Sequence, residues 1–272
     1  MFTFFSQFFA ADSLALYAAA LLATLHGFRD VFGFLTTGYA FSFASMSIVS
    51  FFLYHHTLTP ASFLQGAILI AYGLRLGLFV MWRNHESSYK GQLSKIKGFF
   101  EGTTNRAKVM MWLALSALYF VMYTPMLYKL RREGKGCGLG SSLIGCTIMI
   151  IGLVMEALAD YQKSSYKRSQ QQRYCDIGLY RWVRCPNYLG DIILWIGNWI
   201  AGICGYIHWM HWMISLLGLV AIIFILIDST ARLELAQDER YAKDATFQKY
   251  TKTVPVLVPF VHLYSFKSLY GK

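Results

Sequence analysis

Polar side chains stand inside an apolar stretch of the chain, residues 178–199, which reads GLYRWVRCPNYLGDIILWIGNW. Asn187, Asp191 and Asn198 recur at helical spacing, so that a helix here has one polar face. An ionised group at the centre of a bilayer is unfavourable by roughly 2.5–3.5 kcal/mol, and such groups usually face the interior of a helix bundle. This face therefore predicts a polar partner or a ligand.

A second set of polar residues precedes this stretch. Glu156 and Asp160 are four residues apart, and a helix continues their face to Lys163 and then Lys167. Carboxylates suit ribose hydroxyls and cations suit phosphates, but simple i,i+4 pairing accounts for the spacing equally well. The planar guanidinium group matches phosphate oxygens, and the same loop contains several arginines. These are Arg168, Arg173, Arg181 and Arg184.

A third set lies near the middle of the chain and combines polar with aromatic residues. Its members recur every three or four residues: Tyr72, Arg75, Phe79, Arg83 and Glu86. Two polar faces and one basic loop predict a shared cavity for a polar, anionic ligand. The residues alone do not name that ligand.

The composition places these residues in a membrane protein. Hydrophobic residues make up 56% of the 272, and only 14% are charged, against about 25% in soluble domains. Apolar runs of about 20 residues match a bilayer core about 30 Å thick. Seven occur, at 13–28, 34–54, 61–82, 107–128, 138–158, 187–207 and 209–228. We predict an all-α polytopic membrane protein with a single domain, residues 1–272.

The basic residues predict an orientation. With seven spans, 20 of the 25 Lys and Arg residues fall on one side of the membrane, and that side is expected to be cytosolic. The amino terminus is then outside, and the cavity opens to the cytosol. Basic loops beside anionic lipids explain the net charge of +11. Because these residues are divided among loops, we expect contact with membrane lipids and no nucleic acid.

The cysteines and histidines predict no metal. The five cysteines form no CxxC pair, so neither a disulfide framework nor a zinc site is expected. The paired histidines, at 55–56 and at 208 and 211, are expected at the membrane interface. After the last span, 232–252 favours helix, whereas the prolines in 253–264 predict an extended segment. Asp228 and Arg232 are four apart, which fits either a helical ion pair or a site role.

One long motif resembles a known family. The run EALADYQKSSYKRSQQQRYCDIGLYRWVRCPNYLGDIILWIGNW, residues 156–199, resembles the carboxyl-terminal signature of the steroid 5α-reductase family, especially its bacterial branch. The resemblance implies an integral membrane enzyme of the bacterial inner membrane or the endoplasmic reticulum. Such an enzyme uses NADPH to reduce a carbon–carbon double bond conjugated to a ketone, in a lipophilic, steroid-like substrate drawn from the bilayer. It also implies that 1–128 form the substrate side and 138–272 the cofactor side. We expect a monomer.

The same resemblance assigns roles by motif position. Asp160, Lys167 and Arg173 would contact the nucleotide, and Asn187 and Asp191 the nicotinamide. Tyr72 would bind the substrate carbonyl, assisted by Asp30, which stands where other members use a Gln-Glu pair. Cys185 in place of a His, and Asp191 in place of a Glu, depart from the pattern. The remaining cofactor-binding candidates are Arg75, Arg83, Lys163, Arg168, Arg181, Trp182, Arg184, Tyr188, Arg232, Arg240 and Tyr241.

Two other functions stay open. Membrane methyltransferases of the isoprenylcysteine and phospholipid type, which use S-adenosylmethionine, resemble the chain in the same Arg-x-Pro-x-Tyr-x-Gly region. They usually carry a Glu-Glu pair before the tail, where this chain has Asp238 and Glu239. The basic loop argues against them, since that methyl donor has no phosphates. A non-catalytic lipid-binding or transport protein, whose polar faces only pack helices, predicts no nucleotide binding.

Overall fold

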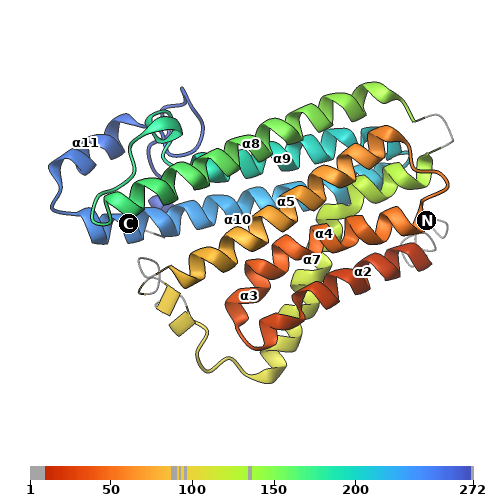
Figure 1. The fold of residues 1–272 in the computed structure, drawn as a ribbon, viewed down its shortest axis with the longest axis horizontal. Coiled ribbons are helices and arrows are strands. Elements are labelled where there is room, and N and C mark those ends of the chain that lie inside the picture. The colour runs from red at the N-terminus through yellow and green to blue at the C-terminus, as the bar shows by residue number, and fades with distance from the viewer. Residues whose placement is uncertain (1–9, 87–90, 92, 95–96, 134–136, 271–272) are drawn as a thin grey trace. The chain divides into compact units, whose positions relative to one another are not determined.

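A computed structural model describes residues 10–86, 91, 93–94, 97–133 and 137–270. Of these described residues, 79% are helical and none lies in a strand. The helices, with η for 3-10 helices, are α2 (Ala11–Thr24), η1 (Leu25–Phe28), α3 (Val31–Leu35), α4 (Thr37–Leu53), α5 (Pro60–His85), α7 (Asn105–Arg132), α8 (Leu139–Ser169), η2 (Gly178–Arg181), α9 (Pro186–Ala201), η3 (Ile203–Gly205), α10 (Trp209–Tyr241), α11 (Ala245–Thr253) and η4 (Lys267–Tyr270) (Figure 1).

The prediction of an all-α polytopic membrane protein is confirmed. Among the described residues, six helical segments are long and apolar enough to cross a membrane. Each of them corresponds to one of the predicted runs. The remaining run, 34–54, contains α4, which is apolar but has only 17 residues. The chain is therefore an integral membrane protein.

The chain divides into two compact units, which are described separately. Unit 1 contains residues 1–146 and 198–218, and unit 2 contains residues 147–197 and 219–272. In unit 1, α4 packs against α2 and α5, and α7 packs against α2. Aromatic side chains from α4, α5 and α7 fill its core, where the rings of Tyr39 and Tyr119 meet edge to face at 5.4 Å.

Unit 1 also contains a buried polar network. The Lys129 ammonium donates to the Gln65 side-chain oxygen at 3.1 Å, and the Gln65 amide donates to the Asn198 side-chain oxygen at 2.9 Å. All three residues are almost fully buried. Buried polar groups are unfavourable unless hydrogen-bonded. Asn198, one member of the polar face predicted to need a partner, has that partner within the protein.

In unit 2, the segment after α11 lies against the chain just before α9. The Arg184 and Cys185 backbone N–H groups donate to the carbonyls of Pro255 and Val256, at 2.9 and 3.0 Å. Val183, Cys185, Leu189, Val256 and Leu257 form the buried core at this point. The predicted helix over 232–252 is confirmed as the end of α10 and most of α11, but a turn at 242–244 interrupts it. The segment 254–266 has no helix, as its prolines predict, but it forms bends and a turn instead of an extended segment.

The prediction that the cysteines form no disulfide is wrong. Cys137 and Cys204 are bonded although 67 positions separate them in sequence. Close packing of the start of α8 against the end of α9 brings them together, since a Cβ on Gly145 would lie only 2.3 Å from the Ala201 nitrogen. Both cysteines fall on the predicted outer side, where oxidising conditions favour disulfides. The orientation itself stays a prediction.

Candidate functional site

The contact between α8 and α9 in unit 2 is made by backbone. A Cβ on Gly152 would lie 2.5 Å from both the Gly190 carbonyl oxygen and the Leu194 nitrogen, and a Cβ on Gly190 would lie 2.7 Å from the Glu156 nitrogen. Only glycine permits this approach, which is typical of helix pairs in membranes. The two helices run side by side (Figure 1).

This register is antiparallel and gathers polar residues at one end of the helix pair. Glu156 lies opposite Gly190, so one further turn of α8 brings Asp160 level with Asn187 in the first turn of α9. Glu156, Asp160 and Asp191 are all buried. One oxygen of Asp191 accepts a hydrogen bond from the Trp195 indole at 3.1 Å. Carboxylates concentrated in this way are the feature expected of a functional site within a membrane. We call this end of the helix pair the α8–α9 site.

Lys167, in the last turns of α8, forms hydrogen bonds to the loop that follows α8 and to the end of α10. Its ammonium group donates to the Tyr241 hydroxyl at 2.6 Å, to the Gln171 carbonyl at 3.3 Å and to the Arg173 carbonyl. These three bonds use its three N–H donors. A phosphate contact by Lys167 therefore requires the exchange of one of these bonds.

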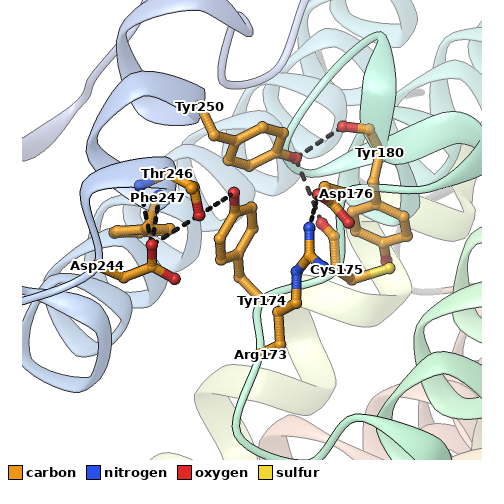
Figure 2. Close-up of polar contacts among 9 residues, drawn as sticks. All are labelled: Arg173, Tyr174, Cys175, Asp176, Tyr180, Asp244, Thr246, Phe247 and Tyr250. Carbon is orange, nitrogen blue, oxygen red and sulfur yellow. Dashed lines mark hydrogen bonds and ion pairs between the residues drawn. The ribbon is translucent and has the colours of Figure 1, made fainter.

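The loop between α8 and η2 is held by the tail helix α11 (Figure 2). The Tyr250 hydroxyl donates to the Tyr180 carbonyl at 2.7 Å. Tyr174 bonds to the Thr246 hydroxyl at 3.1 Å and packs against the Phe247 ring. The Asp244 carboxylate caps the first turn of α11. The basic loop is thus a packed part of unit 2.

Within this loop, Arg173 keeps much of its charge accessible. It forms an ion pair with Asp176 at 2.8 Å, and 52% of its side chain is exposed. Arg168 and Arg181 are also exposed. Exposed guanidinium groups in this loop, together with the buried carboxylates of the helix pair in the same unit, match a ligand with phosphates at one end and hydroxyls at the other.

Gly178 sets the turn that begins η2. Its φ is +56°, in the left-handed region that favours glycine. A Cβ there would also lie 2.4 Å from the Gln162 side-chain oxygen, which accepts the Leu179 N–H at 2.9 Å. Sequence analysis missed Gln162. The signal available in the sequence was its place beside Lys163 within the motif over 156–199.

Burial and hydrogen bonding shift the pKa values of groups in this loop and in the segments beside it. Burial, reinforced by the nearby charge of Asp160, raises the pKa of Tyr180 well above its usual value, and the Tyr180 hydroxyl donates to the Ala159 carbonyl at 3.3 Å. Burial also raises the pKa of the Cys175 thiol. The hydrogen bond from the Thr246 side chain lowers the pKa of Asp244. Tyr180 and Cys175 are therefore neutral near pH 7, and Asp244 is ionised.

Other predicted residues of unit 2 occupy varied settings. The Arg184 guanidinium forms a buried ion pair with Glu234 at 2.7 Å and also donates to the Tyr264 carbonyl. Arg232 pairs with Asp228, as helical spacing allows. The predicted cofactor contacts of both arginines stay predictions. Lys163 is half-buried, Trp182 and Arg240 are exposed, Tyr188 packs against the buried core before α9, and Tyr241 is buried beside Lys167.

Comparison with known proteins gives a family for this fold. The model of DUF1295, described as a protein of unknown function, matches residues 27–254. The chain belongs to the DUF1295 family. No curated protein and no solved structure matches it. The matched residues include both polar helix faces and the whole α8–α9 site of this DUF1295 member.

The predicted substrate residues of this DUF1295 member lie in unit 1. Tyr72 is fully buried, and its hydroxyl donates to the Tyr39 hydroxyl at 2.8 Å. Asp30 is partly exposed and forms an ion pair with Lys97 at 2.7 Å. Arg83 lies over the Phe79 ring, 5.6 Å from its centroid, and Arg75 lies one turn before Phe79 on α5. Sequence analysis did not single out Tyr39.

A cavity of about 310 Å³ also lies in unit 1. None of the predicted cofactor or substrate residues lines it. Its walls are Leu53, Tyr54, His56, Thr57, Leu130, Arg131 and Glu133. Among the residues that the structure describes, no group of three or more His, Cys, Asp or Glu side chains could hold a metal ion.

Proposed function

We propose that this protein is a membrane-embedded, NADPH-dependent reductase of a carbon–carbon double bond conjugated to a ketone in a lipophilic substrate. The observation that carries the proposal is the α8–α9 site, where buried carboxylates and exposed guanidinium groups gather beside one packed loop. Its sequence resembles the steroid 5α-reductase signature over 156–199, and the DUF1295 family is associated with membrane proteins of that kind.

The chemistry of these donors and acceptors fits the cofactor. Asp160 is a buried acceptor suited to ribose hydroxyls, and Arg173 and Arg168 present donors suited to phosphate oxygens. Asn187 offers an amide in the first turn of α9, a position suited to a carboxamide. The helix N-terminus adds a positive dipole that favours anions. Each part of a dinucleotide phosphate thus has a matching group in unit 2.

The protein's own contribution to the reaction is position and electrostatics. NADPH, when bound, supplies the hydride that reduces the double bond. Tyr72 would donate a hydrogen bond to the substrate ketone and stabilise negative charge that develops on its oxygen. One such donor contributes about 3–4 kcal/mol to the transition state. In the structure the Tyr72 hydroxyl donates to the Tyr39 hydroxyl at 2.8 Å, so a hydrogen bond from Tyr72 to the ketone requires the exchange of this bond. The Asp30 carboxylate is already paired with Lys97, so the proposal rests on Tyr72.

The rival readings make different predictions. A methyltransferase of the type considered above would need the acidic pair Asp238 and Glu239, but the Asp238 carboxylate pairs with Lys267 at 2.5 Å. A protein that only binds or transports lipid would bind neither NADPH nor S-adenosylmethionine. The phosphate-matched cations favour the reductase over both.

Equilibrium binding to the purified full-length protein tests the proposal. We expect NADPH to bind more tightly than NADH, and S-adenosylmethionine not to bind. Arg173→Gln should weaken NADPH binding about 10- to 100-fold, because a hydrogen bond to a charged group contributes about 1.5–3 kcal/mol. Lys249→Gln, on the exposed face of α11, is the matched control. Binding of S-adenosylmethionine alone, or of no nucleotide, would overturn the proposal.

A further inference from the structure

Large apolar side chains are exposed in a part of unit 2 that lies outside the membrane-spanning segments. Phe260 is 81% exposed, Leu269 62% and Trp182 60%. The Trp182 and Phe260 rings meet edge to face at 5.9 Å. Trp182 comes from the stretch before α9 and Phe260 from the tail after α11, so their contact joins two distant stretches of sequence, and Leu269 lies later in the same tail. Apolar patches exposed to water usually mark a surface that something covers.

The backbone holds Phe260 in place at the tip of a turn. The Val256 N–H donates to the Leu263 carbonyl at 2.9 Å and closes the turn. Phe260 itself has a φ of +65°, and it is the only residue other than glycine with a positive φ in the described part of the chain. The left-handed region is unfavourable for a bulky residue. The fold therefore keeps an exposed aromatic side chain in a strained position, which an incidental surface residue does not require.

Contacts with α10 place the tail where the hydrocarbon core ends. The apolar part of α10 ends at Ile227, and Asp228 is the first charged residue after it. The Tyr270 hydroxyl donates to Asp228 at 2.5 Å, and the Phe266 N–H donates to Glu234 at 2.8 Å. Between residues 266 and 270 the tail thus runs back along α10 toward its apolar part.

The base of the turn is placed at the same level by a second helix. Its carbonyls at 255 and 256 accept from the backbone of residues 184 and 185, immediately before the apolar helix α9 begins at Pro186. Trp182 stands four residues before that start. Two independent elements, α9 and α10, therefore locate the exposed apolar residues beside the ends of membrane-spanning helices.

The charges beside the patch match a lipid surface. Arg181 adjoins Trp182 and is exposed, and Arg232 is 62% exposed next to the end of the tail. Aromatic rings and basic side chains side by side are the residues found at the membrane–water interface. We propose that Phe260, Trp182 and Leu269 insert into the headgroup and acyl boundary of the bilayer that the protein spans. The tail would then be an interfacial anchor that binds lipid, beyond the proposed function and independent of it.

Spin-label accessibility tests this anchor in the full-length protein. Phe260→Cys is labelled with a nitroxide in nanodiscs of phosphatidylcholine and phosphatidylglycerol, since Cys137 and Cys204 are disulfide-bonded and the other three cysteines are buried. Unmutated protein checks background labelling, and Lys252→Cys, exposed on α11, is the matched control. We expect the label at 260 to collide several-fold more with oxygen, relative to a water-soluble nickel complex, than the control label does.

The other outcomes would overturn the proposal. A ratio at 260 equal to the control means that the turn faces water. Low accessibility to both reagents means that protein, such as a second copy, covers it. Because Phe260→Cys could perturb the turn, Leu269→Cys provides a second label. This label should give the same high ratio of oxygen to nickel accessibility. A ratio equal to that of the control at both positions would refute the proposal.

Discussion

The backbone contact between α8 and α9 makes a quantitative prediction for Gly152→Ala. The added methyl group would lie 2.5 Å from two backbone atoms of α9, where ordinary contact begins at 3.4 Å. The helices must therefore separate by about 0.9 Å at this point. Backbone atoms cannot rotate away as a side chain can, so the strain must spread along both helices. Overpacking of this kind destabilises by about 1–3 kcal/mol.

Thermal unfolding in detergent, followed by the loss of monodisperse protein on size exclusion, measures this effect. A loss of 1–3 kcal/mol should lower the midpoint by roughly 3–10 °C in a protein of this size. Nucleotide binding should weaken as well, because Asp160 and Asn187 are brought level by the same contact. We expect both effects in one variant.

Gly140→Ala in the same helix is the matched control, since a Cβ there would meet nothing within 4 Å. Alanine is favoured over glycine in helices by about 1 kcal/mol, so this variant should be neutral or more stable. If Gly152→Ala proves as stable as Gly140→Ala, α8 and α9 are not in backbone contact. The gathering of polar residues at the α8–α9 site then loses its basis.

Two further predictions concern buried groups of unit 2. Arg184→Met should destabilise the protein by about 3–5 kcal/mol, because it leaves the Glu234 carboxylate buried and unpaired. Adding Glu234→Leu should restore part of this stability. If thermal unfolding shows that the double variant loses as much stability as the two single variants together, the two residues are not coupled. Burial raises the pKa of the Cys185 thiol to about 11 from 9.0, so a maleimide at neutral pH should modify it about 100-fold more slowly than an exposed thiol, from the thiolate fraction alone. Because burial favours the neutral thiol, its contribution to stability is present below about pH 9 and is lost as the pH rises toward 11. Mass spectrometry across a pH series checks the rate, and modification at the rate of an exposed thiol would contradict the burial.

The sequence predicts the helices of this protein well because the bilayer limits what a spanning segment can be. A run of about 20 apolar residues has few alternatives to a helix, since hydrocarbon satisfies no backbone hydrogen bonds. The run at 34–54 shows the limit of this rule. Ser42, Ser47 and Ser50 of α4 are buried within unit 1, and the Ser50 hydroxyl accepts from Tyr123 at 2.9 Å. Its serines reflect packing against other helices.

The pairings between distant residues could not be predicted from the same patterns. Arg184 and Glu234 are 50 positions apart, and no local periodicity links them. Sequence analysis considered Arg184 as a phosphate ligand because its neighbours are basic, and it did not consider Glu234. The partner of a buried charge depends on which helices pack together, and a single sequence does not contain that information directly.

The polar face of α9 illustrates both the strength and the weakness of reasoning from a polar stripe. The stripe predicts that its members need partners, and two of them have partners in the protein. Asn198 pairs with Gln65, and Asp191 accepts from Trp195. Asn187, at the end of the stripe nearest the basic loop, is half-buried in the first turn of α9. The stripe therefore serves packing along most of its length, and the case for a ligand is strongest at this end.

The bond between Cys137 and Cys204 closes a covalent ring that contains the whole of α8, the basic loop and α9. A protease that cut the exposed residues near Gln171 would open this ring without releasing either piece, so a nicked molecule would keep its two parts tethered. In the orientation predicted here, a disulfide bond on the outer side of the membrane would thereby keep the protein in one piece after cleavage on the cytosolic side.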